Sequence, residues 1–250
     1  MTFYVFARTM DDIADSPDLS PSEKTDRLEM FADIVAGGIQ RPGYEAASAM
    51  AQSLSETGGN VQHCLDLAAA FCQDARQDRY DDWTALMAYC RLSAAPVGRY
   101  LLDLHGGGVD GYGPSDALCC ALQVINHLQD CGDDYRTLNR VYLPGDWMDR
   151  EGADVAMLGD SQISVQLRRV LDRALTSTEE LLRESRGLPG GLSSRRLGME
   201  AAVIQRIAEA LVVKLYQQDP LARQVSLGRV QVGVCGVLGV FSGVFSARRA

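Results

Sequence analysis

Apolar residues recur at intervals of three and four along most of the chain, which is the periodicity of amphipathic helices. Alternation with a period of two, rich in Val, Ile and Thr, is almost absent. Breaks containing glycine or proline separate the periodic segments at 16–21, 37–43, 58–59, 106–114, 143–146, 152–159 and 187–191. Pro96 and Gly98 predict a further interruption inside a helical run. Since no break is long enough for a domain linker, the pattern predicts a single all-α domain over residues 1–250.

The first periodic segment, TFYVFARTMDDIAD, carries a continuous polar stripe beside its apolar residues. Five polar residues recur along it at helical spacing and share one face: Tyr4, Arg8, Asp11, Asp12 and Asp15. The helix should end near Asp15, because Ser16 precedes a proline and such residues disfavour the α conformation. The aspartates therefore crowd a helix C-terminus, where the helix dipole disfavours each acidic group by roughly 0.3–1 kcal/mol.

A second segment, ALCCALQVINHLQDCGDDYRTL, repeats this arrangement. Four polar residues follow one another at spacings of three, four and four: Gln123, Asn126, Asp130 and Asp134. Asp133 adds another carboxylate near the same helix end. A solvated acidic face would explain one such cluster, because exposed like charges cost only about 0.2–0.5 kcal/mol per pair. Two clusters, each preceded by polar side chains on the same face, favour a functional site.

Carboxylates without His or Cys at ligand spacing suit a hard cation, Mg²⁺ in particular. This ion takes one or two carboxylates, retains waters and completes its shell with phosphate oxygens. Two facing clusters would hold a diphosphate between them through bridging ions, and Arg8 would add a fork of donors. The predicted chemistry is the loss of diphosphate as a leaving group. His63, His105 and His127 show no metal-ligand spacing and are predicted to be ordinary helix or loop histidines.

The net charge of -9 and the absence of a basic patch exclude a nucleic-acid partner. Seven cysteines without a C-x-x-C spacing indicate reduced thiols, and no basic segment precedes the short apolar run at the start. We therefore expect a cytoplasmic protein. The tail VQVGVCGVLGVFSGVFSARR is too short for the roughly 20 apolar residues that span a bilayer. It is predicted to be a core helix, with peripheral contact at the inner membrane face as the alternative.

Three motifs carry a resemblance to a known family: Y-x-x-x-R-x-x-D-D-I-A-D, Q-x-x-N-x-x-Q-D-x-x-x-D and R-V-Y-L-P. Together they resemble the squalene/phytoene synthase family of isoprenoid-joining enzymes, from residue 1 to about residue 230. The resemblance implies an isoprenoid synthase helical bundle with a central active-site cavity and a Mg²⁺ cofactor. It also implies that relatives have a further helix before the first motif, which we expect this chain to lack.

The resemblance assigns roles to the two polar stripes. The implied metal ligands are Asp11, Asp12, Asp15, Asp130 and Asp134. The residues implied to bind the diphosphate end of the substrate are Tyr4, Arg8, Gln123, Asn126 and Arg140. Gln129 stands where many relatives carry arginine, which implies a looser grip on the diphosphate there.

The segments CRLSAAPVGRYLL, LQDC and DYRTLNRVYLP look most like the hydroxysqualene synthases of bacterial hopanoid biosynthesis. Such enzymes are expected to ionise presqualene diphosphate, rearrange the cation and capture it with water. Tyr89 and Phe71 are aromatic candidates for stabilising that cation. Two alternatives stay open: condensation of two prenyl diphosphates such as farnesyl diphosphate, and a non-catalytic helical scaffold.

Overall fold

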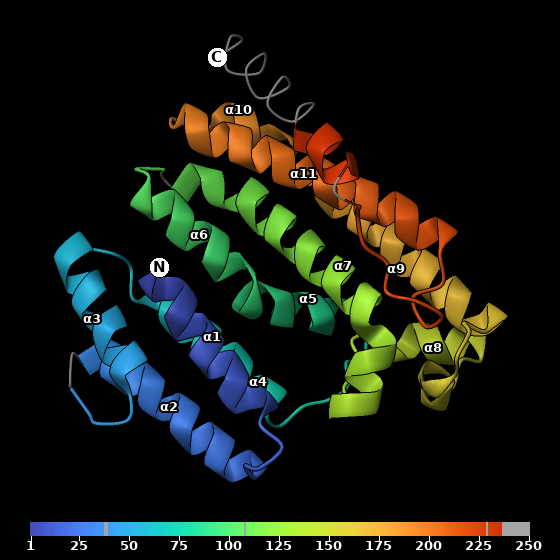
Figure 1. Cartoon of the computed structure of the whole chain (residues 1–250), viewed down its shortest axis with the longest axis horizontal. Helices are drawn as coiled ribbons and strands as arrows, with labels where there is room; N and C mark the ends of the chain where they lie inside the picture. The colour runs from blue at the N-terminus through green and yellow to red at the C-terminus, as the bar shows by residue number, and fades with distance from the viewer. Residues whose placement is uncertain (38–39, 108, 229, 237–250) are drawn as a thin grey trace.

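Amphipathic helices joined by short turns run through the chain in the computed structural model, which describes residues 1–37, 40–107, 109–228 and 230–236 (Figure 1). The elements are α1 (Thr2–Asp15), α2 (Pro21–Gly37), α3 (Glu45–Thr57), α4 (Gln62–Asp74), α5 (Trp83–Ser93), α6 (Ala95–Leu104), η1 (Val109–Gly111), α7 (Tyr112–Leu138), α8 (Gly145–Glu151), η2 (Val155–Gly159), α9 (Val165–Glu184), η3 (Ser185–Gly187), α10 (Leu188–Gly191) and α11 (Arg195–Gln217). Within these residues there is no strand, so the predicted all-α class is confirmed.

Most helix ends fall where the glycine and proline signals place them. Helix α1 ends at Asp15, directly before Ser16 and Pro17. Helix α2 begins at Pro21; proline has no backbone N–H, but the N–H groups of a first turn have no partner within the helix in any case. One boundary was predicted wrongly. Helix α7 begins at Tyr112 and takes Pro114 into its first turn, because a proline there removes no helical hydrogen bond.

The buried apolar residues form two clusters, and each of the two aspartate-bearing helices packs into a different one. Helix α1 packs on α2, α3 and α4, and its Phe6 and Met10 lie in the first cluster with Phe31 and Met50. Helix α7 runs through the second cluster, in contact with α5, α6, α9 and α11 (Figure 1). Helix α4 contacts both α1 and α5. It therefore joins the two cores and helps to set the distance between α1 and α7.

None of the described helices is long and apolar enough to cross a membrane. The predicted C-terminal core helix lies mostly outside the described residues, which end at 236. Residues 230–236 are helical, and Val230, Val232 and Val234 on them are exposed.

The close contact between α6 and α7 depends on Gly98. The helical run breaks at Ala94, and Pro96 lies in the first turn of α6, as the sequence predicts. A Cβ atom on Gly98 would lie 2.4 Å from Ser115 Oγ and 2.7 Å from Cys119 Sγ.

We predict that Gly98→Ala lowers the free energy of unfolding by about 1–3 kcal/mol, because Ser115 and Cys119 must leave their packed rotamers or α6 and α7 must move apart. Urea denaturation followed by circular dichroism measures this loss. Gly113→Ala is the control, since nothing lies within 4 Å of its Cβ position in the first turn of α7. An equal loss in both variants would show that the contact with α7 is not the cause.

Candidate functional site

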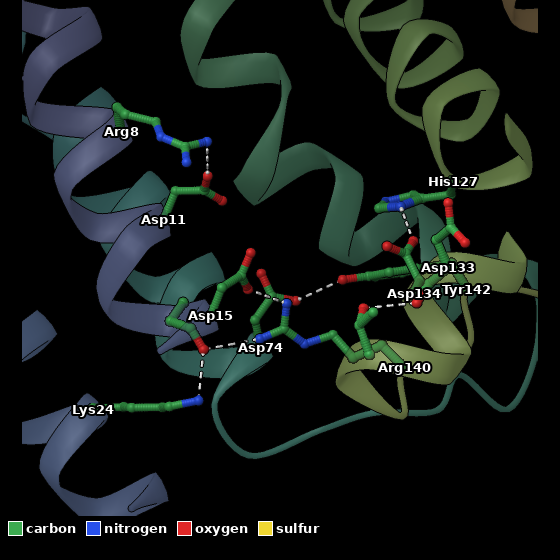
Figure 2. A network of polar contacts seen from close by, with 12 residues as sticks. Arg8, Asp11, Asp15, Lys24, Asp74, His127, Asp133, Asp134, Arg140 and Tyr142 are labelled. Atoms are coloured by element: carbon green, nitrogen blue, oxygen red, sulfur yellow. Dashed lines mark hydrogen bonds and ion pairs between the residues drawn. The ribbon is translucent and has the colours of Figure 1, made fainter. Parts of the chain in front are cut away.

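The two aspartate clusters lie at helix ends that face one another across Arg140. Figure 2 shows Asp11 and Asp15 on α1, opposite Asp133 and Asp134 on α7. Asp15 is close enough to Asp134 that its charge contributes to raising the pKa of Asp134. The structure therefore brings together two motifs that are more than a hundred residues apart in the sequence.

Arg140 and Lys24 stabilise the acidic end of α1. The Arg140 guanidinium pairs with Asp15 at 2.6 Å and donates to the Ala14 carbonyl at 3.1 Å. Lys24 Nζ donates to the same carbonyl at 2.8 Å (Figure 2). Two cations at the last carbonyls offset the partial negative charge of the helix C-terminus. These two cations therefore help to account for an aspartate at this helix end without a metal ion.

The residues implied to bind diphosphate lie in different surroundings. Arg8 pairs with Asp11 at 2.9 Å and with Asp12 at 2.7 Å, and all three side chains are more than a third exposed. Tyr4 and Asn126 are exposed, so a ligand can reach both. Gln123 Nε2 contacts His127 Nε2 at 3.1 Å, whereas Arg140 is buried against α1.

Burial and mutual repulsion raise the pKa of several carboxyl groups. Burial, followed by the charge of Asp130, raises the pKa of Asp134 to about 7. Burial and Asp133 raise the pKa of Asp130, and burial and Asp15 raise that of Asp11. These carboxylates therefore carry more negative charge in a confined space than the nearby cations neutralise, which is a setting that binds a divalent cation.

The donor set fits Mg²⁺ in the form that the sequence predicts. All the ligands offered are carboxylate oxygens, which this ion prefers. Among the described residues, no three His, Cys, Asp or Glu side chains lie together as a complete metal-binding group. An ion here would draw only one or two ligands from each helix and the rest from water and diphosphate.

Asp74, at the end of α4, is a site residue that the sequence analysis missed. Its carboxylate accepts hydrogen bonds from Tyr89 at 2.9 Å and from Tyr142 at 3.3 Å. Burial raises the pKa of Asp74 to about 6, against the opposing charge of Arg140. Asp74 lies outside the motifs found in the sequence. The only local feature that could have indicated it is its position as an acidic residue at the C-terminus of a helix.

An aromatic group surrounds Asp74. The rings of Tyr89 and Tyr142 stack with centroids 5.7 Å apart, and Tyr80 lies 5.3 Å from Tyr89. His127 stacks on Tyr142 at 3.5 Å, with Nδ1 4.0 Å from Asp134. Burial and Arg140 lower the pKa of His127 to about 3, so its ring is neutral. The histidine is a packed helix residue, as predicted, and it lies directly beside the second aspartate cluster.

Two other sequence candidates have structural partners. Gln129 donates to the backbone carbonyl of Val225, and thereby ties α7 to the segment after α11. Gln129 therefore has a structural role, separate from any effect on diphosphate binding. Phe71 packs against the first hydrophobic cluster, together with residues of α1 and α2.

Comparisons with known proteins agree with this geometry. The family model for squalene/phytoene synthase matches residues 1–233. A hydroxysqualene synthase from Zymomonas mobilis subsp. mobilis is 43% identical over 228 residues, covering 90% of this chain and 76% of that protein. Another from Rhodopseudomonas palustris is 43% identical over 232 residues, covering 92% and 78%.

Solved structures show the same fold. A squalene synthase from Alicyclobacillus acidocaldarius aligns with a TM-score of 0.76 and 28% identity, over 87% of this chain and 81% of that one. A dehydrosqualene synthase aligns with a TM-score of 0.80 and 22% identity, over 98% and 86%. The fold and the paired aspartate helices thus define an isoprenoid synthase. The chain belongs to the squalene/phytoene synthase family and is an enzyme acting on a prenyl diphosphate.

We predict that Arg140→Met lowers the free energy of unfolding by about 3 kcal/mol in metal-free buffer, because Asp15 and the Ala14 carbonyl lose a buried partner. Urea denaturation at neutral pH measures the change. Arg136→Met, which removes an exposed pair with Asp133 at the same helix end, should cost less than about 1 kcal/mol. Equal effects would contradict a special role for Arg140.

We predict that the Asp74 carboxyl group makes the protein less stable as pH rises from about 4 to about 6 in metal-free buffer. Since the pKa of Asp74 lies above its ordinary value of 3.8, the native state binds this proton more tightly than the unfolded state. The pKa of Asp134 is shifted in the same direction, and the lowered pKa of His127 has the opposite effect on stability, so the contribution of Asp74 is measured as the difference between wild type and Asp74→Asn. Urea midpoints at intervals of pH give both curves. Parallel curves would contradict a raised pKa at Asp74.

Proposed function

We propose that the enzyme converts presqualene diphosphate to hydroxysqualene in a Mg²⁺-dependent reaction that releases diphosphate, as part of hopanoid biosynthesis. The observation that supports this most strongly is the 43% identity to two hydroxysqualene synthases over nine-tenths of the chain. Family membership favours this activity over the non-catalytic scaffold. The two carboxylate clusters and their supporting cations are also in place.

The diphosphate end of the substrate would bind between α1 and α7. Asp11, Asp12 and Asp15 would hold metal from one side, and Asp130 and Asp134 from the other. Magnesium bound there would neutralise the charge that develops on the leaving diphosphate. Arg8, Tyr4, Gln123 and Asn126 would supply hydrogen bonds, and Arg8 would exchange its aspartate partners for phosphate oxygens.

The prenyl chains would lie against an apolar surface on α6. Val97, Leu101 and Leu104 recur at spacings of four and three, and are 37%, 43% and 46% exposed. A stripe of exposed apolar side chains on one helical face indicates a binding surface rather than an ordinary solvated one. Such a wall would also keep bulk water from the cation.

Arg140 and Asp74 support the reaction indirectly. Arg140 fixes the position of Asp15, and Asp74 holds the hydroxyls of Tyr89 and Tyr142 so that their rings have one orientation. Aromatic faces nearby can stabilise a carbocation. We also propose that the enzyme works in the cytoplasm, in peripheral contact with the membrane that dissolves its apolar substrate.

The proposal predicts that the purified protein with Mg²⁺ forms hydroxysqualene from presqualene diphosphate. Mass spectrometry of the extracted products, with a parallel assay of released diphosphate, measures this. Asp130→Asn should reduce both products at least about 100-fold, because one of the carboxylates that would hold the metal is lost.

The same assay with farnesyl diphosphate distinguishes the sibling activity. Presqualene diphosphate or phytoene-type condensation products from that substrate, without hydroxysqualene from presqualene diphosphate, would assign a condensing enzyme instead. A folded protein that turns over neither substrate would contradict both catalytic assignments.

A further inference from the structure

A polar opening lies behind the aspartates, on the side of α1 that faces α2 and the end of α4. Its volume is about 390 Å³. Charged side chains contribute much of its lining, among them Asp15, Lys24, Asp74, Asp78 and Arg140. Water can therefore occupy this opening, which adjoins the aspartate site through Asp15 and Arg140.

Asp74 connects this opening to the protein interior. Asp74 lines the opening, and its carboxylate accepts hydrogen bonds from the hydroxyls of Tyr89 and Tyr142. Tyr89 is 3% exposed, so its ring lies inside the core. An ionised carboxylate has about four lone-pair sites, and the two tyrosines use two of them. The remaining sites are available to water on the side of the opening.

Aromatic rings form a wall beside Asp74. Tyr80, Tyr89 and Tyr142 stack around Asp74, and His127 extends the stack to α7. The hydroxyls of Tyr89 and Tyr142 both donate to the Asp74 carboxylate, and Figure 2 shows the contact with Tyr142. Aromatic faces suit a carbocation, and the carboxylate beside them suits a water molecule.

We propose that this opening admits the water that captures the carbocation, and that Asp74 holds this water and accepts its proton. The inference rests on the proposed function, in which water is a substrate. The water oxygen forms a bond to the cationic carbon, one O–H bond breaks, and the proton passes to the Asp74 carboxylate. The alcohol and a neutral carboxyl result, and the carboxyl then returns its proton to solvent through the opening.

The other charged groups near Asp74 are less suited to this step. Arg140 and Lys24 face it as cations and have no proton-accepting role. Asp15 pairs with Arg140 at 2.6 Å. Asp78 accepts a hydrogen bond from Asn139 at 3.3 Å and makes no contact with Tyr89 or Tyr142. Of the carboxylates that line the opening, Asp74 alone is hydrogen-bonded to the aromatic wall.

The test is a comparison of two rates in the same Mg²⁺-containing reaction with presqualene diphosphate: diphosphate release and hydroxysqualene formation. Ionisation precedes water capture, so the two rates separate the steps. In Asp74→Asn, hydroxysqualene formation should fall about 100-fold, as for loss of a general base. Diphosphate release should fall much less, and the product should shift to hydrocarbons formed by proton loss.

Two further variants separate this role from a structural one. Ala75→Leu narrows the opening without changing the carboxylate, and should also shift the product from alcohol to hydrocarbon. Asp78→Asn removes a carboxylate from the same opening and should leave the product ratio unchanged. Mn²⁺ binding, followed by electron paramagnetic resonance, should be the same in all three variants, which shows that the metal site is intact.

The outcomes distinguish the two proposals. Diphosphate release by wild type without any hydroxysqualene would overturn the proposed function and this inference with it. Normal hydroxysqualene formation by wild type, with an unchanged product ratio in Asp74→Asn and Ala75→Leu, would overturn the inference alone. A parallel fall in both rates would show that Asp74 only stabilises the fold, and would also overturn it.

Discussion

The buried guanidinium of Arg140 is the interaction on which the site depends. Removing a charged group from water costs several kcal/mol, which only close pairing and hydrogen bonds can offset. Arg140 finds these at the end of α1, on Asp15 and the Ala14 carbonyl. Because Arg140 follows α7 by two residues, satisfying it also fixes the C-terminal end of α7 against that of α1. The separation of the two aspartate clusters is thus set by an ion pair that need not touch substrate.

The same interaction divides the carboxylates into two groups. Asp15 is neutralised in part by Arg140, and Lys24 offsets the helix dipole beside it. Asp130 and Asp134 have no arginine or lysine partner within salt-bridge distance among the described residues, and burial, followed by repulsion from neighbouring carboxylates, raises their pKa values. The supporting cations hold the backbone in place, and the outer carboxylates are the ones that the proposed metal ions would use. Such preorganisation would let the site stabilise a leaving diphosphate with the end of α1 already held in position.

Charged and apolar side chains of the candidate site lie in different parts of the molecule. Carboxylates and their cations gather where α1, α4 and α7 end, whereas α6 presents Val97, Leu101 and Leu104. Asp74 and its tyrosines lie at the boundary, with a charged opening on one side and aromatic rings on the other. A prenyl diphosphate has the same division between a charged head and apolar chains, which accounts for the fit between this fold and the substrates of its family.

The sequence by itself determined the helices and the faces that carry the two aspartate stripes. Both depend on neighbours three or four residues apart, so local periodicity and the Ser16–Pro17 signal were enough. Only the tertiary structure decided which cations support the aspartates and that Asp74 joins them. Arg140 and Asp15 are 125 residues apart, and Asp74 and Tyr142 are 68 apart. Such pairs arise when helices from different hydrophobic clusters pack together, and no periodicity within one helix records that packing.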